Sequence, residues 1–327
     1  MAEQDVGRIK RSSIVKKYNH SMVLYMRHGS CNLQKNEQLY STSVGVHFVN
    51  DLKSASKAMD IAKILVFIER LCDNSDSSRE PFEYSLSMSL PEVLERPHIC
   101  CERTPIGWNE DPFFERNNNL DVLKQGYCRS ITHFADFVAV SPELYLLEMK
   151  DRLSVCSTNY CGVFLLMMVY NAYLNNYEGI LFPHGFRYSL SQKREDPEFN
   201  EFLQDLVEYL YTNVATVFQE IQVTAEEYAL LKSIVIFSGV MNLTDVGSSI
   251  VLRARRKYSA LLSEYVVATQ PDLSPSEQMM RLTRLFGIIP YMMHASDRYN
   301  MYSARMVLMN IGNIAGSLSY DLHVRKF

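Results

Sequence analysis

The chain has 327 residues, of which 47% are hydrophobic and 21% charged, an ordinary globular composition that allows a sizeable core. Its net charge of −4 at pH 7 excludes the strongly basic surface that is typical of nucleic-acid-binding proteins. Glycine (13) and proline (11) are few, whereas methionine (16), tyrosine (20) and phenylalanine (16) are many. This balance favours packed helices over a turn-rich β fold.

The seven cysteines form no C-x-x-C pair, so the sequence contains no zinc module of paired cysteines. The N-terminal segment carries basic residues between Lys10 and Lys17 but no hydrophobic signal-peptide core, and we expect reduced thiols in the nucleus or the cytoplasm. We interpret these basic residues as a solvated linker rather than an import signal. Residues 1–50 lack sustained periodicity and predict an N-terminal extension or hinge before a core of residues 51–327.

The first core helix is predicted from about Ser56 to Cys72, where apolar residues recur on one helical face. A proline-rich connection follows it and predicts a short helix between two extended stretches, because Pro91, Pro97 and Pro105 each restrict the backbone. Cys100 and Cys101 are neighbours in this connection. We interpret them as packing residues rather than a redox pair.

A longer helix is predicted from Leu120 to Ala139. Pro142 should end it, because proline lacks an N–H and pushes the preceding residue out of the helical region. The next helix contains the apolar run Gly162 to Tyr170, which is too short to cross a bilayer. With its flanking residues this run predicts a helix buried on all sides, and no contact with a membrane.

The C-terminal half predicts a small β-hairpin followed by helices. Leu181 to Tyr188 combines a Pro-x-Gly turn with flanking aromatic residues, as hairpins do. A helix is predicted to start at Asp196-Pro197. Two more begin at capping boxes, one at Thr224 to Glu227 with an apolar run that ends at Phe237, and one at Ser274 to Glu277 with an apolar run that ends at Ile289. Between these two, apolar residues at helical spacing predict a helix from Ile250 to Tyr265.

The most specific pattern in the chain lies between Asp136 and Val155. Phe137 ends one helix, the turn Pro142-Glu143-Leu144 follows, and the next helix opens with Leu147, Asp151, Arg152 and Val155. This order and spacing resembles the signature segment of nuclear-receptor ligand-binding domains. The connection from Ser89 to Trp108 is similar to nematode receptors of the group related to hepatocyte nuclear factor four. The likeness covers roughly Ser56 to Leu322, although any helical core with a helix after a proline turn is an alternative for the signature segment alone.

The resemblance implies an all-α fold, a three-layer antiparallel helical sandwich with a small β-hairpin, an apolar pocket, a coregulator groove and a mobile C-terminal helix. It implies a nuclear-receptor-like regulator of transcription, located in the nucleus, that binds an apolar ligand, coregulator proteins and a dimer partner. Because the zinc DNA-binding domain of the family is absent from the sequence, we expect no direct DNA contact by this chain. We expect no cofactor and no enzymatic activity. The alternative is a helical carrier or enzyme for apolar small molecules. The sequence contains no phosphate loop, nucleophile elbow or metal-ligand spacing that would support an enzyme.

The ligand pocket of the family corresponds to seven residues on two helices: Leu123, Tyr127, Ser130, Phe164, Met167, Met168 and Asn171. Such aromatic and thioether side chains suit a lipophilic ligand, and a filled core is the alternative. Related receptors bind a fatty-acid carboxylate with an arginine at the position of Asn171. A neutral amide does not pair with a carboxylate in this way, so an acidic ligand is not expected.

The coregulator groove of the family corresponds to Ala135, Ala139, Arg152, Leu153, Cys156, Ser157 and Asp321. Ala139 and Ser157 occupy positions that are basic in the family, and Arg152 is a candidate replacement for the missing charge. The C-terminal motif keeps an acid at Asp321 but has His323 where the family prefers an apolar residue. We therefore expect coregulator recruitment to be constitutive or repressive rather than switched on by a charged lipid.

The helix from Ser276 to about Ile289 corresponds to the main subunit interface of the family and implies a homodimer or a heterodimer with another nuclear receptor. Its apolar residues outnumber those that one core-facing stripe needs. We assign the dimer contacts to Met279, Leu282, Leu285 and Phe286. Burial of these side chains within one chain is the alternative.

Overall fold

The computed structural model describes residues 58–73, 84–108, 119–185, 187–191, 197–239, 242–325 and 327. The predicted extension of residues 1–50 lies outside them. The described chain is mostly helical, with the following α-helices: α3 (Ala58–Cys72), α4 (Leu90–Glu95), α5 (Asn119–Val138), α6 (Met149–Leu174), α7 (Pro197–Leu210), α8 (Thr216–Ile221), α9 (Ala225–Ile236), α10 (Asp245–Thr269), α11 (Pro275–Leu308) and α12 (Ser317–His323).

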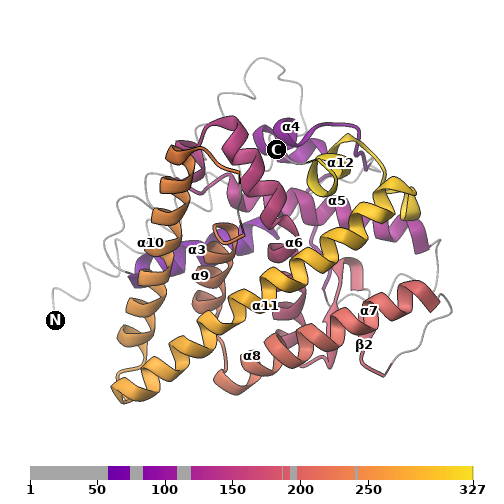
Figure 1. Cartoon of the computed structure of the whole chain (residues 1–327). Coiled ribbons are helices and arrows are strands. Elements are labelled where there is room, and N and C mark those ends of the chain that lie inside the picture. The colour runs from indigo at the N-terminus through magenta and orange to yellow at the C-terminus, as the bar shows by residue number, and fades with distance from the viewer. Residues whose placement is uncertain are drawn as a thin grey trace.

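The helices form three layers, as the resemblance implies. Helices α3 and α5 make one outer layer, α6, α9 and α10 the middle layer, and α11 with α7 and α8 the other outer layer. Figure 1 shows α11 crossing α6, with α12 and α4 together at one end of the molecule. The expected hairpin is confirmed, because β1 (Gly179–Leu181) and β2 (Arg187–Ser189) pair in antiparallel register with Ile180 opposite Tyr188.

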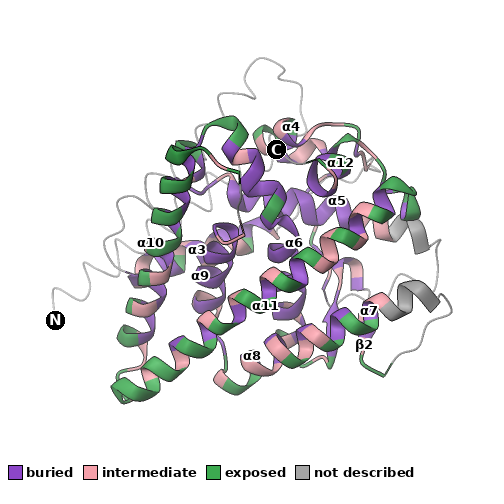
Figure 2. Cartoon of the chain, viewed as in Figure 1, coloured by how far each residue is buried: buried purple, intermediate pink, exposed green. Residues whose placement is uncertain are grey.

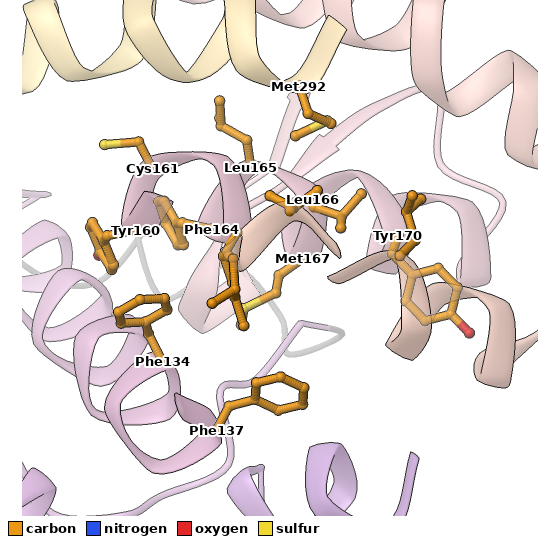
Figure 3. Packing of buried hydrophobic residues seen from close by; sticks show 14 of the residues in the cluster. Phe134, Phe137, Tyr160, Cys161, Phe164, Leu165, Leu166, Met167, Tyr170 and Met292 are labelled. Carbon is orange, nitrogen blue, oxygen red and sulfur yellow. The ribbon is translucent and has the colours of Figure 1, made fainter. Parts of the chain in front are cut away.

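Helix α6 is the centre of the core, and its burial on all sides confirms the prediction from the sequence. It is long and apolar enough to cross a membrane, yet 94% of its most apolar window is buried inside the protein. Figure 2 shows α6 buried at the centre, with exposed residues along the outer faces of α10 and α11. In Figure 3, Phe134 and Phe137 of α5 lie on one side of α6 and Met292 of α11 on the other.

Local sequence signals determine where several helices begin and end. Helix α5 ends at Val138, before Pro142, as predicted. The Thr224 hydroxyl accepts a hydrogen bond from the N–H of Glu227 at 3.2 Å, and the Glu227 carboxylate accepts one from the N–H of Thr224 at 2.9 Å. This reciprocal box starts α9, and Ser274 starts α11 in the same way.

The predicted end of a helix near Ile289 is wrong, because α11 continues through Pro290 to Leu308. Proline inside a helix removes one backbone hydrogen bond and crowds the preceding turn. Pro290 lies on the exposed side of α11, whereas Ile288 and Met292 are buried beneath it. Packing of this buried face on α6 therefore keeps the helix continuous.

The charged residues of the signature segment join the layers. Asp136 on α5 accepts two hydrogen bonds from the buried guanidinium of Arg103, at 2.7 and 2.8 Å. Glu143 accepts one from the Lys257 ammonium at 2.8 Å and one from the Tyr258 hydroxyl at 3.0 Å, which attaches the turn after α5 to α10. The signature therefore has a structural explanation in these contacts.

Asp151, in the first turn of α6, holds the start of α10. Its carboxylate accepts hydrogen bonds from the N–H of Thr244 at 3.1 Å and from its hydroxyl at 2.5 Å, while Thr244 itself caps α10. The carboxylate lies so close to Gly247 that a Cβ at this position would overlap it. Glycine is thus required at position 247 by the approach of a neighbouring side chain.

A buried ion pair joins α3 to α9. The Lys232 side chain is fully buried, and its Nζ lies 2.6 Å from Oε2 of Glu69 and 4.1 Å from the centre of the Phe137 ring. Glu69 also accepts a hydrogen bond from the Tyr228 hydroxyl at 2.9 Å. The Lys232 ammonium has no contact with water, and the Glu69 carboxylate and the face of the Phe137 ring stabilise its charge instead.

We expect Lys232→Met to lower the free energy of unfolding by about 3 kcal/mol, because it leaves the Glu69 carboxylate without its buried partner. Lys257→Met is the matched control, since this lysine is about one third exposed and its pair with Glu143 contributes about 1 kcal/mol or less. Urea unfolding followed by circular dichroism measures both. Equal losses in the two variants would contradict the assignment.

Candidate functional site

An apolar cavity of about 70 Å³ lies between α5, α6, the hairpin, α7 and α11. Its lining residues are Leu123, Gly126, Tyr127, Phe164, Phe182, Pro183, Phe202, Leu203, Tyr299, Tyr302, Ser303, Met306 and Ile314. The cavity is smaller than the roughly 300–1,000 Å³ of sites that hold drug-sized ligands. The rings of Phe202 on α7 and Tyr302 on α11 stack 3.8 Å apart at its boundary.

The structure brings together three of the seven residues that the sequence assigned to a pocket, namely Leu123, Tyr127 and Phe164. The others lie elsewhere. Ser130, Met167 and Met168 are buried in the core outside the lining. Asn171 donates a hydrogen bond to the Met167 carbonyl at 2.8 Å and borders a separate hollow with Trp108 and Leu174.

The sequence analysis did not identify the contribution of α11 to the cavity, which comprises Tyr299, Tyr302, Ser303 and Met306. These residues follow Pro290, where a helix was expected to have ended. Their spacing of three to four residues would have indicated one helical face if the helix had been continued through the proline. The aromatic residues of the hairpin were interpreted only as a signal of the hairpin itself.

A chain of buried hydrogen bonds connects the cavity to α12. The Tyr127 hydroxyl lies 2.8 Å from Nε2 of His323, and Nδ1 of His323 lies 2.9 Å from Oδ1 of Asn300. An amide oxygen only accepts, so Nδ1 carries the proton and Nε2 accepts from the tyrosine. Burial lowers the pKa of His323 to about 3 and raises the pKa of Tyr127 well above its usual value. Both groups are therefore neutral in the folded protein.

Protonation of His323 should destabilise the fold, and the sign follows from its depressed pKa. The unfolded chain binds the proton near pH 6.5, whereas the folded protein binds it only near pH 3. Stability should be complete above about pH 6.5 and fall as the pH drops towards 3. His323→Gln, which does not titrate, should flatten this dependence in urea unfolding between about pH 7 and pH 4. His133 and His184, whose pKa values burial also lowers, contribute to the slope that remains. Identical slopes would disprove the role of His323.

The residues assigned to the coregulator groove lie around the junction of α5, α6 and α12. Ala135, Leu153, Cys156 and Ser157 are buried, and Ala139 is partly buried. A small hollow at this junction is lined by Leu94, Val138, Ala139, Leu144, Tyr145, Arg152 and Cys156. Helix α4 contributes Leu94 to the edge of this hollow.

The two charged residues of this region have partners within the chain. Arg152 donates to the carbonyl oxygens of Leu144 at 3.0 Å and Leu147 at 3.5 Å, so its guanidinium is directed to the turn before α6. Asp321 is buried on α12. Its Oδ2 accepts a hydrogen bond from the N–H of Leu90 at 3.0 Å, and its Oδ1 lies 3.0 Å from the Arg325 guanidinium.

The residues assigned to a dimer interface divide into two groups. Leu282 and Leu285 are buried in the core of the chain and Phe286 is partly buried, whereas Met279 is 63% exposed. Met280 beside it is equally exposed. Among the described residues no group of three or more histidine, cysteine or acidic side chains could hold a metal ion. The six cysteines of the described chain are buried free thiols.

A helical sandwich with an apolar cavity coupled to its C-terminal helix defines the class of ligand-binding regulatory domains. The family model for the ligand-binding domain of nuclear hormone receptors matches residues 119–303, which is more than half of the chain. The chain belongs to the nuclear hormone receptor family. This confirms the resemblance that was inferred from the signature segment.

Two relatives are nematode receptors. The chain is 24% identical to nuclear hormone receptor family member nhr-100 of Caenorhabditis elegans over 271 residues, which cover 80% of this chain and 60% of that protein. It is 22% identical to nuclear hormone receptor family member nhr-4 of the same organism over 235 residues, which cover 69% and 46%. The matched region thus spans about half the length of these relatives.

Proposed function

We propose that this protein regulates transcription in the nucleus by binding a neutral apolar ligand and passing its presence to a coregulator surface. The observation that carries the proposal is the contact between Tyr127, which lines the cavity, and His323 on α12. A ligand that moves Tyr127 changes the only partner of Nε2 of His323 among the described residues. The position of α12 then depends on the state of the cavity.

The lining of the cavity selects the class of ligand. Aromatic and aliphatic side chains predominate, and the described lining contains no lysine or arginine that could pair with a carboxylate. Tyr127 and Ser303 supply hydroxyl groups for one or two hydrogen bonds. These features support a small neutral lipid, and a larger ligand requires the stacked rings of Phe202 and Tyr302 to separate.

An apolar carrier would share this cavity, but it would not need the connection to α12. We assign no catalytic residue, in keeping with the ligand-regulated and generally non-enzymatic character of the family. We also propose dimerisation through α11, with fewer contact residues than the sequence suggested. Met279 and Met280 provide the exposed apolar surface, since Leu282 and Leu285 already serve the core. A monomer in sedimentation velocity at every tested concentration would contradict it.

The cavity should bind the neutral apolar dye Nile red when the stacked rings of Phe202 and Tyr302 separate to admit it, and Leu203→Trp should weaken this binding at least about tenfold. Leu203 is buried in the lining, so the larger indole fills the space that a ligand needs. Leu252→Trp is the matched control, because it makes the same change at an exposed position of α10 outside the cavity lining and should bind like the unmodified protein. Fluorescence titration measures the affinities.

The same complexes separate a regulator from a carrier. Hydrogen exchange of α12 should change on dye binding in the unmodified protein and remain unchanged in Tyr127→Phe, which keeps the ring but lacks the hydroxyl that contacts His323. Equal affinity of Leu203→Trp and the unmodified protein would contradict the cavity as the binding site. Dye binding without any change in α12 would favour the carrier.

A further inference from the structure

Helix α4 is a short amphipathic helix whose apolar residues are already docked on the rest of the protein. Leu90, Val93 and Leu94 recur at spacings of three and one residue, which places them on one face. Leu90 and Val93 are almost completely buried, whereas Glu92 and Glu95 on the other face are exposed. A helix of six residues is not stable in water by itself, so docking holds it in shape.

The surface that receives α4 is formed by α5, α6 and α12. Leu94 lies at the edge of the hollow beside Val138 at the end of α5 and Cys156 of α6. Figure 1 shows α4 beside α12 at the end of the molecule where the chain terminates. The docking surface thus coincides with the junction at which the sequence resemblance placed a coregulator groove.

A carboxylate fastens the N-terminus of α4 to this surface. The Asp321 side chain on α12 accepts the N–H of Leu90 at 3.0 Å in a buried environment, which satisfies one of the N–H groups that a helix start leaves unpaired. The Leu86 carbonyl in turn accepts the N–H of Leu318 in the first turn of α12 at 3.1 Å. The segment from Leu86 to Leu94 and α12 therefore hold each other in place.

Among the described residues, no charged side chain of the receiving surface caps the C-terminus of α4. Ala139 and Ser157 carry no charge, and the Arg152 guanidinium is directed to the carbonyls of Leu144 and Leu147. Pro97 follows α4 directly and prevents its continuation. The segment after α4 is attached to α5 through the Thr132 hydroxyl, which donates to the Pro97 carbonyl at 3.2 Å. Helix α4 itself is held by Asp321 and by apolar side chains, and a foreign helix with the same features can replace it there.

We propose that α4 is an internal competitor that covers the docking surface for a foreign apolar helix. The foreign partner is a coregulator helix of the Leu-x-x-Leu-Leu type, because its leucines repeat the spacing of Leu90, Val93 and Leu94 and its free N-terminus can take the place of α4 at Asp321. This inference rests on the proposed function, in which the junction of α5, α6 and α12 contacts coregulators. Recruitment then requires α4 to leave the docking surface. In the absence of a partner helix, α4 covers this surface.

The test uses the full chain and a fluorescein-labelled synthetic peptide that repeats residues 86–98 of this protein. The double variant Leu90→Ala/Val93→Ala removes the side chains that dock α4, so its surface should bind the peptide at least about tenfold more tightly than the unmodified protein does. Glu95→Ala is the matched control, because it changes the exposed face of the same helix and should bind like the unmodified protein. Fluorescence anisotropy measures the affinities.

A second variant removes α4 by another route, in case the first does not fold. A Cβ at Gly316 would overlap the Leu86 backbone, so Gly316→Ala separates the start of α12 from the segment that leads into α4 without changing a side chain of α4, α5 or α6. This variant should also bind the peptide more tightly than the unmodified protein. Adding Asp321→Ala to either variant should reverse most of the gain, because the side-chain oxygen that accepts from the N–H of the incoming helix is lost.

Two outcomes would overturn the inference. In the first, the unmodified protein would bind the peptide as tightly as the folded variants, so α4 would not compete with it. In the second, no folded variant would bind the peptide, so the surface would not accept a helix. Nile red binding, measured on the same samples, reports separately on the proposed function. If the unmodified protein binds the dye but the variants do not bind the peptide more tightly, only the role of α4 as a competitor is overturned. If the unmodified protein does not bind the dye, the result contradicts the ligand cavity.

Discussion

The burial of the central part of α6, residues 159–170, on all sides is the constraint on which the rest of the structure depends. A helix that is apolar around its whole circumference satisfies its backbone internally but must be covered on every side. Helices α5, α9, α11 and α12 and the hairpin provide this cover, and their three-layer arrangement follows from it. The apolar cavity lies where the packing of α5, α7 and α11 around α6 leaves space.

Buried polar contacts determine how the layers lie against one another. Apolar packing alone would allow several such arrangements of similar energy. Arg103 with Asp136, Lys232 with Glu69 and Arg281 with Glu227 are charged pairs at 2.6 to 2.8 Å that each join different elements. Apolar side chains tolerate sliding, whereas a buried charge without its partner is costly. Asp136, which belongs to the signature segment, thus has a structural role in joining the layers.

Helix α12 lies between the two functional regions and has a polar contact with each. On the cavity side, His323 meets the hydroxyl of Tyr127, and on the outer side Asp321 meets the N-terminus of α4. Because α12 has only seven residues, it depends on these neighbours for its position. The cavity and α4 therefore both contact one element, and the proposed regulation depends on this arrangement.

The sequence by itself determined what depends on local chemistry and on hydrophobic pattern. The proline after α5, the capping boxes at Thr224 and Ser274 and the uniformly apolar run in α6 fixed element boundaries and the family, because each acts within a few residues of the chain. Only the tertiary structure decided the cavity lining, the partner of His323 and the place of α4. These depend on residues distant in the sequence: packing on α6 carried α11 through Pro290, and no local signal placed Asp321 against a helix 231 positions away.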